Sequence, residues 1–177
     1  LILAWSIGGI CSVDYLNTGG FVGNLVNNST FPVFILPAIT FLVASFLGFA
    51  TGTSWGTMAL LIPIGAAICT PASTAHLIMP VLGSILAGAL YGDHISPISD
   101  TTILSSTGAS CNHIDHVSTQ VVYASVAAGC CAVGYVIMGI LNNGLVSTAV
   151  TLAILLLVLF IISKKFRTKI DYSNVEK

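Results

Sequence analysis

The sequence predicts an all-α, polytopic transmembrane helix bundle, and three of its properties support this class. Of its 177 residues, 55% are hydrophobic and only 6% are charged, whereas soluble domains carry about 25% charged residues. Several apolar segments approach or exceed the roughly 20 residues that a helix needs to cross a bilayer. Polar stretches interrupt these segments and predict broken or re-entrant helices. The lipid bilayer is therefore the expected partner, and the net charge of −1 indicates no nucleic-acid partner.

The first 70 residues are expected to contain a partial helix, a loop and a long apolar unit. Residues 1–13 resemble the end of a helix, and the Gly- and Asn-rich residues 14–30 predict a loop with at most a short helical turn. Residues 31–69 are about twice the length of one span. The polar stretch ATGTSWGT at 50–57 interrupts them. This interruption indicates either a hairpin of two helices or one helix that breaks and resumes.

Three further apolar segments are expected to form helices in the membrane, at 75–91, 117–141 and 145–163. Four of the five basic residues follow directly, in KKFRTK. Because basic residues favour the cytoplasmic side, we expect a cytoplasmic C-terminus. Since the chain opens within helix-like apolar sequence, we expect residues 1–163 to be the C-terminal transmembrane portion of a longer protein. Residues 164–177 would then form a cytoplasmic basic tail.

The most polar stretch of the apolar region is GDHISPISDTT, which begins at Gly92. An aspartate at the centre of a membrane helix costs about 2.5 to 3.5 kcal/mol on insertion scales, so Asp93 and Asp100 are expected to have a function. Pro97 lacks a backbone donor and disfavours helix in the residue before it. We therefore predict that residues 92–101 interrupt the helix and approach residues 51–55, because neither break can satisfy its polar groups in lipid alone.

This stretch is rich in oxygen ligands of the kind that a hard cation such as Na⁺ prefers. The candidate ligands are the carboxylates and hydroxyls of Asp93, Ser96, Ser99, Asp100, Thr101 and Thr102. A carboxylate in a low-dielectric site favours its protonated form, and a bound cation favours the ionised form. Proton and cation would compete for one group, which is the basis of antiport. We take Asp100 as the coupling carboxylate and Asp93 as its neighbour in a sodium site.

Simpler interpretations remain open for both polar stretches. GDHISPISDTT could be an external loop with helix-capping residues. ATGTSWGT could be a packing motif whose hydroxyls bond backbone carbonyls. His94, His113 and His116, together with an aspartate, could bind Zn²⁺ in an intramembrane metalloenzyme, although their spacing matches no familiar zinc signature. His113 and His116 are otherwise expected to be a solvated polar start of the following helix.

Two segments resemble the signature stretches of the NhaC-type sodium/proton antiporter family. They are TGTSWGTMALLIPI at 51–64 and GDHISPISDTTILSSTGASCNHIDHVSTQ at 92–120. The sequence departs from relatives at Ile95, where they often have Cys, and at Asn112, where they often have Asp. The residues that match the family's two polar motifs are Asp93, His94, Ser96, Asp100 and Thr101 in one, and Thr51, Thr53, Ser54 and Thr57 in the other.

The resemblance implies part of an inverted-repeat ion transporter of the bacterial inner membrane that exchanges Na⁺ for H⁺. Thr51, Thr53 and Ser54 would then join the cation and proton site, with His94 and Thr57 as accessory residues. It implies a carrier and not an enzyme, with no cofactor besides the transported ions. The N-terminal half of the same transporter would complete the site, and a homo-oligomer is compatible with the sequence. An antiporter of organic anions such as malate or lactate, coupled to Na⁺ or H⁺, is the alternative function.

Overall fold

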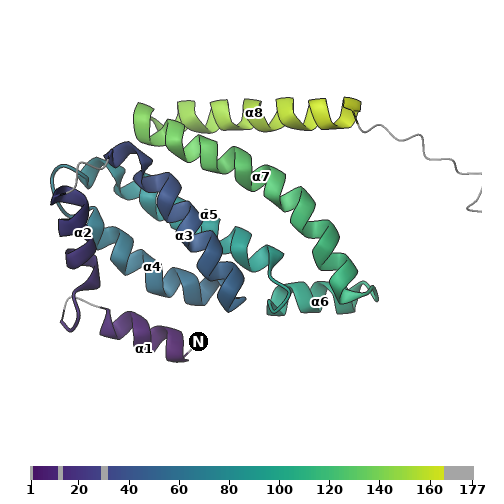
Figure 1. Ribbon diagram of the computed structural model, residues 1–177, viewed down its shortest axis with the longest axis horizontal. Helices are drawn as coiled ribbons and strands as arrows, with labels where there is room; N and C mark the ends of the chain where they lie inside the picture. Colours follow the sequence, from purple (N-terminus) through teal and green to yellow (C-terminus); the bar gives the residue numbers. More distant parts are fainter. Residues whose placement is uncertain (1, 12–13, 29–31, 166–177) are drawn as a thin grey trace, which may run out of the picture.

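The computed structural model describes residues 2–11, 14–28 and 32–165, and every regular element among them is helical. Figure 1 shows their arrangement, in which α3, α4, α5 and α7 pack together. In chain order the elements are α1 (Ile2–Ile10), α2 (Thr18–Asn28), η1 (Val33–Ile35), α3 (Leu36–Thr51), α4 (Ser54–Ile68), η2 (Ala75–Leu77), α5 (Ile78–Ile95), α6 (Asp100–Gly108), α7 (His113–Leu141) and α8 (Gly144–Lys165). The predicted all-α class is confirmed.

Four helical segments of the described chain are long and apolar enough to cross a bilayer. They are Val33–Thr51, Ala75–Ile95, His113–Leu141 and Gly144–Lys165. The helix α4 is apolar but shorter, at 15 residues. The chain is therefore polytopic by the length and composition of its helices, as the sequence predicts.

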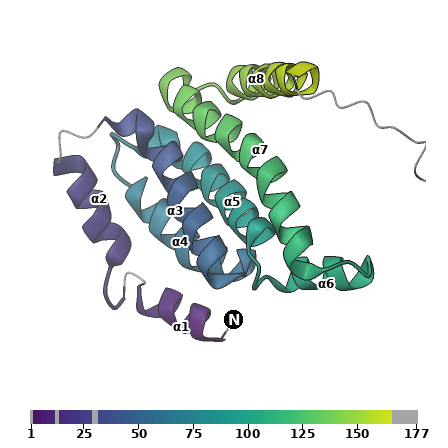
Figure 2. The same cartoon turned by 45° about the vertical axis from the view of Figure 1, so that its right-hand side comes forward.

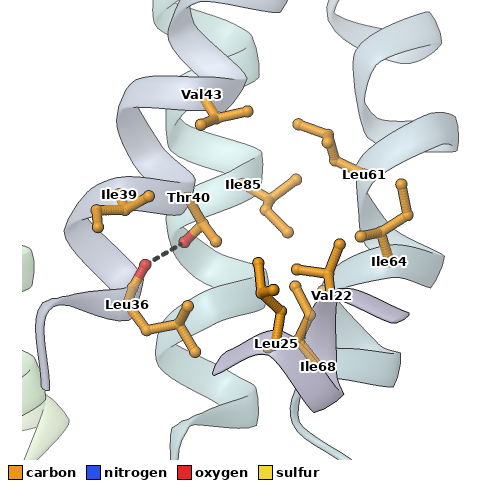
Figure 3. Close-up of a pocket in the computed structure, with 11 residues that line it drawn as sticks. Val22, Leu25, Leu36, Ile39, Thr40, Val43, Leu61, Ile64, Ile68 and Ile85 are labelled. Carbon is orange, nitrogen blue, oxygen red and sulfur yellow. Dashed lines mark hydrogen bonds between the residues drawn. The ribbon is translucent and has the colours of Figure 1, made fainter. Parts of the chain in front are cut away.

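The residues between 50 and 57 form a helical hairpin, which resolves the two alternatives that the sequence left open. The helix α3 ends at Gly52, whose φ of 62° is left-handed, and Thr53 caps α4 by accepting a bond from the Gly56 N–H at 3.3 Å. Leu36, at the start of α3, and Ile68, at the end of α4, line the same apolar cavity of about 510 Å³, which Figure 3 shows. The two helices are therefore antiparallel.

The predicted loop at 14–30 is wrong for most of its length, because α2 occupies Thr18–Asn28. The side chain of Asn17 accepts a bond from the Gly20 N–H at 3.2 Å and so caps the start of this helix. The glycine at position 19 allows close packing, since a Cβ there would collide with Ala67 of α4. The Gly and Asn residues that suggested a loop therefore serve as a cap and as a contact surface for α4.

The helices α3 and α5 make the most extensive contact among the described helices, through small residues four positions apart. A Cβ on Gly88 would collide with the Phe41 carbonyl and lie 2.9 Å from the Ala44 Cβ. A Cβ on Gly48 would lie 2.7 Å from the Ala89 carbonyl oxygen. Such spacing lets helix backbones approach in a membrane. The contact holds the C-terminal ends of α3 and α5 together, and both helix breaks begin at those ends.

Replacing Gly88 by Val is expected to lower the free energy of unfolding by about 1 to 3 kcal/mol, as overpacked cores do. The added methyl groups would force α3 and α5 apart. Thermal unfolding of the purified protein in detergent measures the effect. The matched control is Gly83→Val in the same helix, where nothing lies within 4 Å of an added Cβ. Equal unfolding temperatures for the two variants would contradict the proposed contact.

Candidate ion-binding site

The two helix breaks lie against each other, as the sequence predicts. A Cβ on Gly52 would lie 2.8 Å from Cγ1 of Ile98 and 3.0 Å from its carbonyl oxygen. The hydroxyl of Ser96 donates to the carbonyl of Phe49, in the last turns of α3, at 2.8 Å. The break between α3 and α4 and the break between α5 and α6 therefore form one junction.

The second break is shorter than the predicted range of 92–101. The residues from Gly92 to Ile95 belong to α5, and Asp100 and Thr101 belong to α6, so the break covers 96–99. Gly92 is helical, and its missing Cβ lets α5 contact the Ser45 carbonyl of α3. Pro97 ends the helix, since the residue before it adopts an extended backbone with ψ of 128°.

Ends of four helices meet at this junction. The helices α3 and α5 end here with their last carbonyl groups, while α4 and α6 begin here with their first N–H groups. Helix C-termini carry partial negative charge, and helix N-termini carry partial positive charge. The junction can therefore stabilise a cation near one pair of ends and a carboxylate near the other. Figure 2 shows α6 as a separate short helix at the foot of α7.

Asp93 and Asp100 lie in very different environments. The side chain of Asp93 is only 6% exposed, and its Oδ1 has no hydrogen-bond partner among the described residues. Asp100 is exposed, and its Oδ1 accepts a bond from the Thr101 N–H at 2.8 Å, in the first turn of α6. A buried carboxylate oxygen without a partner is rare, because its desolvation is not offset. Of the two carboxylates, Asp93 is therefore the one with a buried oxygen that no described residue hydrogen-bonds.

The hydroxyls of the polar stretch at 92–102 surround the break between α5 and α6. Ser96 and Ser99 are fully buried, and Thr102 is 3% exposed. The hydroxyl of Thr102 donates to the His94 carbonyl at 3.3 Å, and the Ser99 and Thr101 hydroxyls are 2.8 Å apart. A hydroxyl that donates its hydrogen to a carbonyl keeps its lone pairs. These oxygens therefore satisfy the broken backbone and can still face a cation.

The hydroxyls of the polar stretch at 51–57 mainly hydrogen-bond to groups within the hairpin of α3 and α4. Thr51 donates to the Leu47 carbonyl at 2.7 Å, and Thr57 donates to the Thr53 carbonyl at 2.9 Å. The hydroxyls of Thr51 and Thr57 are 3.2 Å apart, and Ser54 is buried at the start of α4. These bonds match the packing interpretation that the sequence left open. Their membership of an ion site stays a prediction.

The three candidate zinc histidines have separate surroundings. Nε2 of His94 lies 2.6 Å from the amide nitrogen of Gln120, while both ring nitrogens of His113 contact other protein groups. Nε2 of His116 is buried without a partner in the described chain. Within that part, no group of three His, Cys, Asp or Glu residues could hold a metal ion. The zinc alternative therefore gains no support from these residues.

Sequence reasoning missed Gln120, which links α7 to the end of α5. It lies one helical turn beyond His116, and both side chains have a buried polar atom without a partner among the described residues. A spacing of four residues places them on one face of α7. This polar face was the available signal, because the rest of α7 is strongly apolar.

Helices of membrane-spanning length, two helix breaks in contact and a buried carboxylate in the last turn of α5 are typical of polytopic membrane transporters. Similarity to known proteins then identifies the family. The family model described as "Na+/H+ antiporter family" matches residues 1–140. The chain belongs to this family.

Several curated relatives are similar to this chain. An uncharacterized protein of Haemophilus influenzae is 44% identical over 165 residues, covering 93% of this chain and 31% of the relative. The malate-2H(+)/Na(+)-lactate antiporter of Bacillus subtilis is 29% identical, covering 73% of this chain and 30% of the relative. An uncharacterized Na(+)/H(+) antiporter of H. influenzae is 30% identical, covering 58% and 24%. The chain therefore spans less than a third of the length of these relatives. No solved structure matches it.

Proposed function

We propose that this chain is part of an NhaC-type secondary antiporter that exchanges Na⁺ for H⁺, with Asp93 as the group that both ions share. The observation that carries the proposal is the burial of Asp93 in the last turn of α5, just before the break at 96–99, with an oxygen that no described residue hydrogen-bonds. Intramembrane acids are costly and usually mark ion pathways. Membership of the Na+/H+ antiporter family supports the same function.

The proposed site alternates between two occupied states. When ionised, Asp93 would hold Na⁺ together with hydroxyl oxygens from Ser96 and Ser99, which are buried in the adjoining break. When protonated, Asp93 is neutral and can remain buried without a cation. An empty, ionised site would leave an unpaired buried charge, which is unfavourable in the membrane. The carrier would therefore change its orientation only with one of the two ions bound.

The assignment of the coupling group to Asp93 replaces the sequence-based preference for Asp100. Asp100 is exposed in the described chain, whereas Asp93 is buried with an oxygen that no described residue hydrogen-bonds. Asp100 also has a local role, since its Oδ1 accepts a bond from the Thr101 N–H and a negative charge is favourable at the start of a helix. Asp100 would then attract cations toward the junction or complete their ligand set.

We also propose a bacterial inner-membrane location with the C-terminus in the cytoplasm. The helix α8 carries Lys164 and Lys165 in its last turn, and basic residues at the end of a span favour the cytoplasmic side. The lipid bilayer and the remaining portion of the transporter are the proposed partners, and a homo-oligomer remains compatible with the proposal. The transported ions are Na⁺ and H⁺, with no further cofactor proposed.

An antiporter of organic anions is the second candidate function. It is favoured by one observation, the 29% identity to a protein named as a malate-2H(+)/Na(+)-lactate antiporter. The same sodium and proton site would serve in both cases. The additional substrate would bind elsewhere in the complete transporter.

Proteoliposomes that contain the complete transporter are expected to take up or release protons when a Na⁺ gradient is imposed, without any organic acid. Internal pH, read with a fluorescent dye, measures the exchange. The assay is repeated with Li⁺ and K⁺, and with malate and lactate on opposite sides. Proton movement that requires an organic acid would support the second candidate, and none with any cation or acid would refute both.

A further inference from the structure

His113, the first residue of α7, connects three segments around the second helix break. Its Nε2 lies 2.7 Å from the Pro97 carbonyl oxygen in the break, and its Nδ1 lies 3.0 Å from the Ser106 hydroxyl in α6. Ser106 is itself only 2% exposed. One side chain therefore joins the break, α6 and α7.

The partners of His113 define the roles of its two ring nitrogens. A carbonyl oxygen can only accept, so Nε2 must carry a hydrogen and donate it to Pro97. The Ser106 hydroxyl has one hydrogen, which it can donate either to Nδ1 of the neutral ring or to the Ile103 carbonyl at 2.9 Å. Helix breaks release carbonyl groups that would otherwise lack a partner in the membrane. His113 provides such a partner to the released carbonyl of Pro97.

A tight turn between α6 and α7 places His113 over Ser106. The Cys111 N–H donates to the Ser106 carbonyl at 3.1 Å, and Ser110 reverses the chain with a φ of 53°. Asn112 caps α7 by accepting bonds from the N–H groups of Ile114 and Asp115 at 2.9 and 3.3 Å. His113 is therefore held both by the hydrogen bonds of its ring and by the capped backbone at the start of α7.

The break is held from two opposite elements. On one side, the Ser96 hydroxyl binds the Phe49 carbonyl of α3, and on the other, His113 of α7 binds the Pro97 carbonyl. Adjacent residues of the break are thus attached to different helices. If the contact with His113 were lost, the attachment to α3 would remain, but Pro97 and the residues after it could shift.

We propose that His113 is a positioning residue that holds the break at 96–99 in its cation-binding geometry through the Pro97 carbonyl. This role rests on the proposed Na⁺ and H⁺ exchange. His113 does not touch the cation, and it acts by fixing the backbone that carries Ser96 and Ser99. Its loss would weaken Na⁺ binding more than it slows the conformational cycle.

The test compares His113→Asn with His113→Gln in the complete transporter. The shorter Asn amide reaches the position of Nδ1 and can keep the contact with Ser106, whereas the longer Gln amide reaches the position of Nε2 and can donate to Pro97. Positioning partners of a bound ion typically contribute 10- to 100-fold in affinity, so we expect at least a ~10-fold higher KM for Na⁺ in His113→Asn. His113→Gln should stay within about 3-fold of the wild type, since it restores the donor.

His76→Asn is the matched control. His76 is exposed and lies just before the start of α5, at the end of that helix away from the break. The KM for Na⁺ of this variant should not change. Maximal exchange rate and unfolding temperature are measured alongside. Equal KM values in His113→Asn and His113→Gln would overturn the proposal. A lower maximal rate in His113→Asn at unchanged KM would do the same, because it indicates a purely structural role. Absence of exchange in the wild type would instead refute the proposed function, and this role with it.

Discussion

Replacing Asp93 by Asn is expected to reduce Na⁺-driven proton movement to the level of protein-free liposomes. Asparagine keeps the size and hydrogen-bonding capacity of the protonated acid but cannot titrate. The variant therefore represents one occupied state and cannot convert to the other. Because it removes a costly buried acid, we expect normal membrane insertion and an unfolding temperature at least equal to that of the wild type. Proton flux in proteoliposomes and thermal unfolding in detergent provide the two measurements.

The comparison with Asp100→Asn separates the two aspartates. Asp100 is exposed at the start of α6, so its loss should leave measurable exchange with a changed KM for Na⁺. Asp93→Glu keeps an acid but moves it by one methylene group, and it should retain slow exchange with an altered pH dependence. Wild-type exchange in Asp93→Asn, with loss in Asp100→Asn, would restore the sequence-based assignment to Asp100. Normal exchange in both variants would leave the site without a proton carrier.

Replacing Gly52 by Val should also remove most of the exchange activity, by separating the two helix breaks. Gly52 has a φ of 62°, and a Cβ there would lie within 3.0 Å of the Ile98 backbone. A left-handed conformation costs an ordinary residue about 1 to 2 kcal/mol, and a β-branched residue is especially unsuited to it. The hairpin would have to change its conformation at the contact with the other break. We therefore expect a lower unfolding temperature and a large fall in Na⁺-driven proton flux.

The matched control for this substitution is Gly129→Val in α7. A Cβ on Gly129 has nothing within 4 Å in the described chain, and this glycine lies in the middle of a helix. Gly52→Ala adds only the Cβ and should have a smaller effect in the same direction. Exchange at the wild-type rate in Gly52→Val would show that contact between the breaks is not required for transport.

Several features follow from local sequence alone. The low content of charged residues and the long apolar segments require a membrane environment, because such a chain cannot cover a surface that faces water. Pro97 disfavours the continuation of α5, since it lacks a backbone donor and restricts the residue before it. The polar stretch around it therefore predicts a break, and its oxygens predict a cation as the ligand. These properties depend on composition and on neighbours in the chain.

Other features depend on contacts between residues far apart in the sequence. The Gly- and Asn-rich residues from Thr18 to Asn28 form a helix because they pack against α4, which local propensity does not reveal. Composition treats Asp93 and Asp100 alike, whereas the tertiary structure buries the first and leaves the second exposed. The bond between His113 and Pro97 spans 16 residues, and the bond between Ser96 and Phe49 spans 47. Burial and partners of this kind depend on how helices cross, which the spacing of residues within one helix does not specify.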